Sequence, residues 1–224
     1  FLLNQNKPQV IIVTSTIKGE GKSFVSYNIA QSYNALGKKV ILIGADLRNP
    51  QVHALIGIER GNLGLSTFLN DVNYNDLDKL IVKGKSIDEI DYLLSGAIPP
   101  NPSELLMRPR MKELLEILKS SYDLIIIDSA PLLLVSDTTP LLPLCDLVVY
   151  VSRAQYSDKN IFPFIKEMHS RENMPPFGMV LNGLIASPSS SNYGYGYRYS
   201  YRYRYSYTYK YNYGYGYGYG RDKE

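Results

Sequence analysis

The chain has 224 residues, enough for one domain with a sizeable core and an additional segment. Of its formal charge of +3, residues 193–224 supply +4 (six Lys and Arg against two acids), which leaves −1 elsewhere, so the remainder is not a basic nucleic-acid binder. The single Cys145 excludes a disulfide framework and favours a reducing compartment, while His53 and His169 are too few for a zinc cluster.

No run of about 18 apolar residues predicts a membrane-spanning helix. Residues 131–151 come closest, but Asp137 and Asp146 interrupt them. No signal-peptide pattern is present at the start of the sequence. Because the chain begins at Phe1 rather than Met, we expect a piece of a longer protein, and an upstream membrane span stays an open alternative.

The first predicted elements form a strand–loop–helix–strand unit. Residues 10–13 are short, continuous and β-branched, which predicts a buried parallel strand. Apolar residues at helical spacing predict a helix over residues 22–36, ended by Gly37. Residues 40–43 predict a second strand.

The loop between the first strand and the helix carries the sequence TIKGEGKS, at residues 16–23. A glycine-rich turn between strand and helix, ending in Lys-Ser, predicts a phosphate-binding loop in which backbone N–H groups hold phosphates. Lys22 is expected to reach the β- and γ-phosphates and Ser23 to bind Mg²⁺. The alternative is a strand–helix turn without a ligand. The predicted nucleotide-contacting residues in the loop are Thr16, Lys18, Gly19, Glu20, Gly21, Lys22 and Ser23.

Asp46 and Arg48 follow the second strand, on the side where ligands bind in open α/β sheets. A carboxylate there can act on the waters of Mg²⁺ or take a proton from an attacking hydroxyl, so Asp46 is a candidate metal residue and base. Arg48 is a candidate catalytic residue that pairs with Asp46 or with phosphate. The alternative for Arg48 is an ordinary surface ion pair.

The middle of the chain predicts a helix over residues 105–118 with Ser103 as N-cap, followed by a buried strand over residues 124–127. Asp128 ends this strand, which is the position of an acid that holds Mg²⁺ through water. The alternative is an aspartate that caps the next turn.

Residues 147–151 and 179–181 predict two further strands, with a helix over residues 158–168 between them. The alternation predicts a doubly wound, mostly parallel sheet of the P-loop NTPase type. Asn182 lies where such folds contact adenine, although Asn-Gly is also an ordinary turn signal. A Pro- and Ser-rich stretch separates a predicted kinase domain, residues 1–188, from a flexible tail, residues 189–224.

From Tyr193 to Tyr219 every second residue of the tail is a tyrosine, and the residues between them are Gly, Arg, Ser, Thr, Lys and Asn. Thirty-two residues reach at most about 100 Å, so these hydroxyls can approach the chain's own phosphate site or a neighbour's. The alternative is a segment that self-associates or binds RNA through stacking. The predicted phosphoacceptors are Tyr193, Tyr195, Tyr197, Tyr199, Tyr201, Tyr203, Tyr205, Tyr207, Tyr209, Tyr211, Tyr213, Tyr215, Tyr217 and Tyr219.

These motifs together resemble the bacterial tyrosine kinases of the BY-kinase family, over about residues 9–185. The resemblance rests on the phosphate loop, the stretches 41–48 and 125–131, the segment PPNPSELL at residues 99–106 and the tyrosine-rich end. It implies autophosphorylation of the tail with ATP and Mg²⁺, a homo-oligomer, and control of capsule or exopolysaccharide export. It also implies a membrane copolymerase, fused or separate, a tyrosine phosphatase, and a cytoplasmic location at the inner face of the membrane.

The sequence departs from this family in two places. Where the family's pattern D-x-D-x-R has its first acid, this sequence has Gly44. Asp46 is therefore the acid of that loop. The family's oligomerisation motif, E-x-x-R-x-x-R, is absent upstream of the phosphate loop.

Two other functions compete with the kinase. One is a switch ATPase of the partitioning type, although Ile17 stands where those proteins carry a signature lysine. The other is a non-enzymatic nucleotide-binding partner of a membrane protein. Phosphotyrosine on the tail separates the kinase from both.

Overall fold

The computed structural model describes residues 7–74, 76–84, 89–133, 137–170 and 174–184. The predicted tyrosine tail and the predicted domain boundary after residue 188 lie outside these residues. Across the described part of the chain, no helix is long and apolar enough to cross a membrane.

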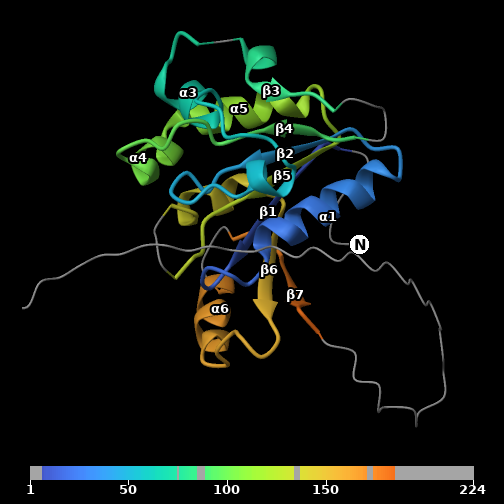
Figure 1. The fold of residues 1–224 in the computed structure, drawn as a ribbon. Helices are drawn as coiled ribbons and strands as arrows, with labels where there is room; N and C mark the ends of the chain where they lie inside the picture. The colour runs from blue at the N-terminus through green and yellow to red at the C-terminus, as the bar shows by residue number, and fades with distance from the viewer. Residues whose placement is uncertain (1–6, 75, 85–88, 134–136, 171–173, 185–224) are drawn as a thin grey trace, which may run out of the picture. The chain divides into compact units, whose positions relative to one another are not determined.

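Seven strands form one sheet in the order β3-β4-β2-β5-β1-β6-β7 (Figure 1). Within the described ranges every neighbouring pair is parallel except β3 with β4, which confirms the predicted doubly wound sheet. The strands are β1 (Gln9–Ser15), β2 (Val40–Gly44), β3 (Ile81–Val82), β4 (Asp91–Leu93), β5 (Leu124–Asp128), β6 (Leu147–Arg153) and β7 (Phe177–Asn182).

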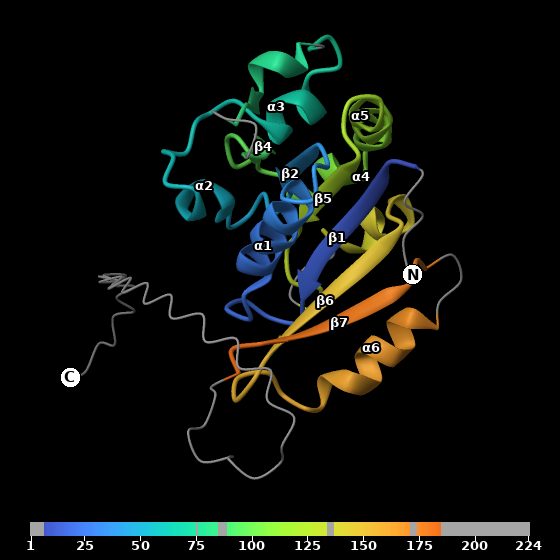
Figure 2. The same ribbon diagram turned by 90° about the vertical axis from the view of Figure 1, so that its right-hand side faces the viewer.

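Helices cover both faces of the sheet, because successive side chains of the central strands point to opposite faces and both sets are apolar. Helices α1 and α2 pack on one face, and α3 to α6 pack on the other; Figure 2 shows α1 and α6 on opposite sides. The helices are α1 (Lys22–Asn34), α2 (Val52–Leu55), α3 (Leu65–Asn70), α4 (Pro102–Met107), α5 (Pro109–Lys119) and α6 (Ile161–His169), with 3₁₀ turns η1 (Leu77–Lys79) and η2 (Thr139–Leu144).

All five predicted strands are present, as β1, β2, β5, β6 and β7. The structure adds β3 and β4, which are too short for a periodic signal. The predicted first helix ends earlier than expected, at Asn34, and Leu36 beyond it is exposed. Cys145 is buried in the apolar core, as the sequence indicates.

The predicted single helix over residues 105–118 is wrong, because the structure has two helices there. Pro109 disfavours the helical conformation at the residue before it, and Arg108 accordingly has an extended ψ of 145°. Helix α4 begins at Pro102 after Asn101, so Ser103 lies inside the first turn and is not the N-cap.

Candidate functional site

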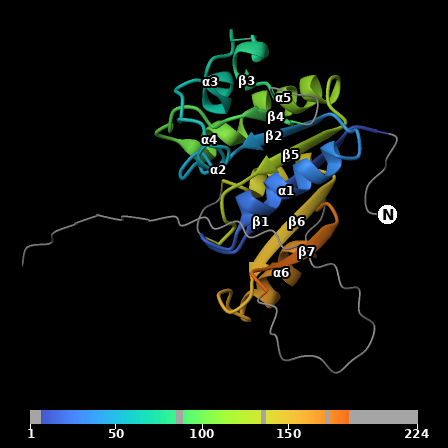
Figure 3. The ribbon, with the colours of Figure 1, turned by 45° about the vertical axis from the view of Figure 1, so that its right-hand side comes forward.

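Strands β1, β2 and β5 end at the same edge of the sheet, so the loops that follow them converge there (Figure 3). In this register Gly44 and Val13 both lie opposite Asp128. The geometry brings Lys22, Asp46 and Asp128 together from three separate motifs, as expected for the carboxyl edge of a doubly wound sheet.

The loop between β1 and α1 has the conformation that phosphate binding requires. Gly19 and Gly21 have φ values of 90° and 97°, a region that favours glycine. Gly21 occupies the N-cap of α1, and no side chain caps this helix. The first N–H groups of α1 therefore lie at the positive end of a 13-residue helix, which suits a phosphate.

Glu20 supports this loop from within. Its side chain is buried and accepts a hydrogen bond from the backbone N–H of Ile17 at 2.8 Å. Its other oxygen accepts a hydrogen bond from the hydroxyl of Ser157. The side chain of Glu20 thus holds the loop together, and the predicted nucleotide contact at Glu20 would fall to its backbone.

Three residues at or just after the ends of β6 and β7 also hold the loop from outside. Arg153 donates from Nη1 to the carbonyl of Gly19 at 3.0 Å, and the hydroxyl of Tyr156 donates to the carbonyl of Lys18 at 2.9 Å. Asn182 donates from Nδ2 to the carbonyl of Glu20 at 3.0 Å. The sequence singled out Asn182 but not Arg153 or Tyr156, whose only signal is their position at the end of a strand or just after it.

Lys22 forms an ion pair with Asp46, with Nζ and Oδ2 3.2 Å apart. Both side chains are buried, with exposed fractions of 11% and 6%. The Asp46 Oδ1 atom accepts the backbone N–H of Asn49 at 3.0 Å, while the Asp46 N–H donates to the carbonyl of Asp128 at 3.1 Å. The candidate base is therefore fixed at both its side chain and its backbone.

Asp128 lies against the start of α1. The Ser23 hydroxyl donates to its Oδ2 at 2.6 Å, and the Ser26 hydroxyl donates to its Oδ1 at 3.3 Å. Burial raises the pKa of Asp128, while the charge of Lys22 and the Ser23 hydrogen bond act in the opposite direction. Ser26, one turn after Ser23, was not predicted from the sequence.

These residues fit Mg²⁺, which prefers hard oxygen ligands and keeps several of its waters. The hydroxyl of Ser23 and the carboxylate of Asp128 supply such oxygens side by side. Among the residues that the structure describes, no three His, Cys, Asp or Glu side chains form an all-protein metal site. The Ser23 and Asp128 oxygens suit a cation that also binds the oxygens of a phosphate.

The hydrogen bonds of Arg48 go to Asp137 and Ser103 rather than to Asp46. Its Nε atom donates to Asp137 Oδ2 at 2.6 Å and its Nη2 atom donates to Asp137 Oδ1 at 3.1 Å. Hydrogen bonding to Asp137 raises the pKa of Arg48, and burial opposes this. The sequence predicts that Arg48 pairs with Asp46, with phosphate or in a surface ion pair. The structure shows an ion pair, and its acid is the buried Asp137.

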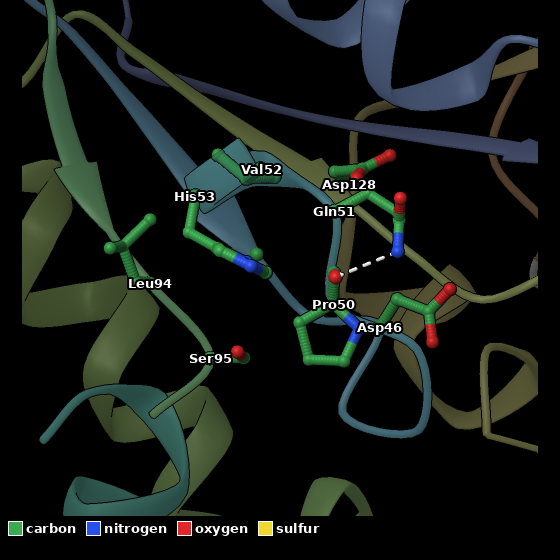
Figure 4. A pocket seen from close by; sticks show the side chains of 9 residues that line it. Asp46, Pro50, Gln51, Val52, His53, Leu94, Ser95 and Asp128 are labelled. Carbon is green, nitrogen blue, oxygen red and sulfur yellow. Dashed lines mark hydrogen bonds between the residues drawn. The ribbon is translucent and has the colours of Figure 1, made fainter. Parts of the chain in front are cut away.

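A small pocket lies beside Asp46 and Asp128 (Figure 4). Gly44 lines it, and a Cβ atom at Gly44 would lie 3.5 Å from Ser95 N and from Val52 Cγ2, which is ordinary van der Waals contact. His53 also lines it; its Nδ1 atom is buried without a hydrogen-bond partner among the described residues, and burial lowers its pKa. The backbone surroundings of position 44 therefore admit a methyl group, although the chain has none there.

The sheet order, the glycine loop before α1 and the paired Lys22, Ser23, Asp46 and Asp128 define a P-loop nucleotide-binding protein of the α/β class. A family model described as an AAA domain matches residues 8–174. The tyrosine-protein kinase YwqD of Bacillus subtilis is 36% identical over 173 residues, which cover 77% of this chain and 71% of YwqD. The chain belongs to the bacterial tyrosine-kinase family.

Solved structures agree with this assignment. The kinase domain of the Escherichia coli tyrosine kinase ETK superposes with a TM-score of 0.73 at 32% identity, covering 88% of this chain and 75% of that one. The septum site-determining protein MinD from Pyrococcus horikoshii, solved with Mg-ADP, has a TM-score of 0.62 at 20% identity. The superposition covers 78% of this chain and 70% of that one. The second likeness concerns the fold alone.

The chain spans only part of some relatives. It covers between 17% and 26% of the length of the first four curated relatives, but 71% of YwqD. The predicted acceptor tyrosines, from Tyr193 to Tyr219, lie outside the residues that the structure describes.

Proposed function

We propose that this chain is an ATP-dependent protein-tyrosine kinase that phosphorylates the tyrosines of residues 193–219, on its own tail or on that of a neighbouring subunit. The observation that supports it most is the meeting of the Lys22–Asp46 pair, at 3.2 Å, with the Ser23–Asp128 pair, at 2.6 Å, on one edge of the sheet. The Lys22–Asp46 pair suits a phosphate and an attacking hydroxyl, and the Ser23–Asp128 pair suits Mg²⁺.

The residues divide the work of phosphoryl transfer, which needs positioning and charge neutralisation more than covalent chemistry. The N-terminal N–H groups of α1 and the ammonium of Lys22 hold the β- and γ-phosphates. Ser23 would hold Mg²⁺ with its hydroxyl and Asp128 would hold it through water. The ion would supply charge neutralisation at the phosphate oxygens.

Asp46 is the base for the acceptor tyrosine. The tyrosine oxygen bonds to the γ-phosphorus as the bond from that phosphorus to the β–γ bridging oxygen breaks, and ADP leaves. The phenol proton passes to Asp46, which Lys22, Asn49 and the end of β5 hold in place.

The test is the intact mass of the purified protein after incubation with Mg·ATP, compared with Lys22→Met. We expect additions of one phosphate each in the wild type, mapping to residues 193–219, and none in the variant. Because Lys22→Met removes the partner of a buried carboxylate, circular dichroism must show that the variant is folded.

A second variant with all fourteen tail tyrosines replaced by Phe controls for indirect effects. It should bind Mg·ADP as the wild type does and incorporate no phosphate into the tail. ATP hydrolysis without phosphotyrosine would instead favour a switch ATPase, and nucleotide binding without either reaction would favour a non-enzymatic partner.

For the cellular setting we propose regulation of capsular or exopolysaccharide synthesis at the inner face of the membrane, with a membrane copolymerase and a tyrosine phosphatase as partners and a homo-oligomer as the assembly. The lengths of the relatives support a copolymerase that is either fused or separate. The matched region is 17% of a putative kinase of Klebsiella pneumoniae but 81% of the CapB protein of Staphylococcus aureus.

A further inference from the structure

A buried carboxylate outside the predicted motifs joins three segments around the site. Asp137 follows Asp128 by nine residues and is only 1% exposed. It accepts two hydrogen bonds from Arg48, at 2.6 and 3.1 Å, and one from the hydroxyl of Ser103. Arg48 also donates to the Ser103 hydroxyl at 3.1 Å, which closes a three-residue cluster.

The hydrogen bonds of this cluster require a defined orientation of the Arg48 side chain. A buried carboxylate is costly unless donors surround it, and the planar guanidinium satisfies both oxygens at once. Lysine has no such fork and would reach one oxygen as a point charge. The pair therefore fixes the orientation of Arg48 as well as its charge.

The donors come from segments that are remote in the sequence. Arg48 is 89 residues before Asp137, in the loop that follows β2, and Ser103 is 34 residues before it, in the first turn of α4. Asp137 itself belongs to the loop that follows β5. Its carboxylate thus ties the loop that carries Asp46 to the loop that follows Asp128.

Asp46 is two residues from Arg48 and is held on its other side by backbone contacts. The N–H groups of Ala45 and Asp46 both donate to the carbonyl of Asp128, at 2.8 and 3.1 Å. The Arg48–Asp137 pair is a further side-chain restraint on the same loop, in addition to the Lys22–Asp46 ion pair. Without it, the loop keeps its attachments to β5 and to Lys22, but the guanidinium of Arg48 is no longer fixed.

We propose that Asp137, together with Ser103, is a positioning residue for phosphoryl transfer. It holds Arg48 and through it sets Asp46 relative to the γ-phosphate and the acceptor oxygen. This inference rests on the proposed kinase function. It assigns Arg48 a role through Asp46 rather than a direct contact with phosphate.

The experiment compares Asp137→Asn, Arg48→Lys and Ser103→Ala in the full chain, with Glu116→Gln as the matched control. Glu116 pairs with Lys119 at 2.9 Å on the exposed side of α5, away from the site. Each variant is measured for kcat and KM with a synthetic tail peptide, for the Kd of Mg·ADP, and for thermal unfolding.

We expect Asp137→Asn to lower kcat at least ten-fold while the Kd of Mg·ADP changes less than two-fold. Arg48→Lys should lower kcat by a smaller factor, because it keeps the charge but loses the fork. The double variant Asp137→Asn with Arg48→Lys should be no slower than the slower single variant, because both changes break one contact. Glu116→Gln should leave kcat unchanged.

An unchanged kcat in folded Asp137→Asn overturns the proposal, as does a kcat loss that only matches the fraction unfolded. If Asp137→Asn does not fold, Arg48→Lys and Ser103→Ala decide, and unchanged kcat in both overturns it. A rise in the Mg·ADP Kd or the ATP KM without a kcat loss would assign Arg48 to phosphate instead. A wild type that transfers no phosphate to the peptide or to its own tail refutes the kinase function itself.

Discussion

Gly21 and Gly44 differ in what an added methyl group would meet. At Gly21 the backbone is left-handed and a Cβ atom would lie 2.1 Å from Asn182 Nδ2. At Gly44 the nearest atoms are 3.5 Å away. Only the first glycine is therefore required by geometry, although both lie at the site.

We predict that Gly44→Ala changes the free energy of unfolding by less than about 1 kcal/mol, whereas Gly21→Ala costs roughly 1–2 kcal/mol from the left-handed backbone alone. Gly21→Ala should also weaken Mg·ADP binding at least ten-fold, because the loop must shift. Urea unfolding and isothermal calorimetry measure both effects. Equal binding losses in the two variants would contradict the geometric argument.

At the scale of elements, the phosphate loop depends on strands other than the one that precedes it. Contacts from Arg153, Tyr156 and Asn182, near the ends of β6 and β7, reach three successive carbonyls of the loop. A loop that must approach phosphates with its N–H groups turns its carbonyls outward, and the neighbouring elements satisfy them.

This arrangement predicts how Asn182→Ala will act. If the amide mainly supports the loop, affinities for Mg·ADP and Mg·GDP should fall by a similar factor, about five-fold for one net hydrogen bond of about 1 kcal/mol. A contact with adenine would instead weaken ADP alone. Fluorescence titration with labelled analogues of both nucleotides measures the ratio, with Asn73→Ala, at an exposed position after α3, as a surface control.

At the scale of the whole molecule, the burial of three tyrosines in the described part of the chain should make the fold sensitive to alkali. Burial raises the pKa of Tyr92, Tyr122 and Tyr150 to about 12. In the unfolded chain a tyrosine titrates near pH 10. Above that pH the unfolded state releases protons that the folded state retains.

Stability should therefore be fully present below about pH 10 and fall as the pH rises toward about 12, by about 1.4 kcal/mol per pH unit for each tyrosine. Urea midpoints measured between about pH 9 and 11 test this. Tyr92→Phe should show a shallower fall than the wild type, because the variant lacks one of the three phenols. Parallel curves for the two proteins would show that Tyr92 does not contribute.

The sequence by itself determined the class of fold and named four residues that the structure brings together at one edge of the sheet. Continuous apolar runs mark strands buried on both faces, and the glycine-rich turn before α1 marks the phosphate loop, since both signals are local. Lys22, Ser23, Asp46 and Asp128 were found because each follows a strand or opens a helix. The break at Pro109 was also readable, but the apolar periodicity across it predicted one helix.

Only the tertiary structure decided which of these residues touch. The bond from Arg48 to Asp137 spans 89 residues and that from Arg153 to Gly19 spans 134. Neither leaves a local pattern, because hydrogen-bond partners across a sheet are chosen by strand order and loop path rather than by spacing in the chain. The sequence therefore named the chemistry of the site, and the packing of distant loops on one sheet edge decided how each group is held.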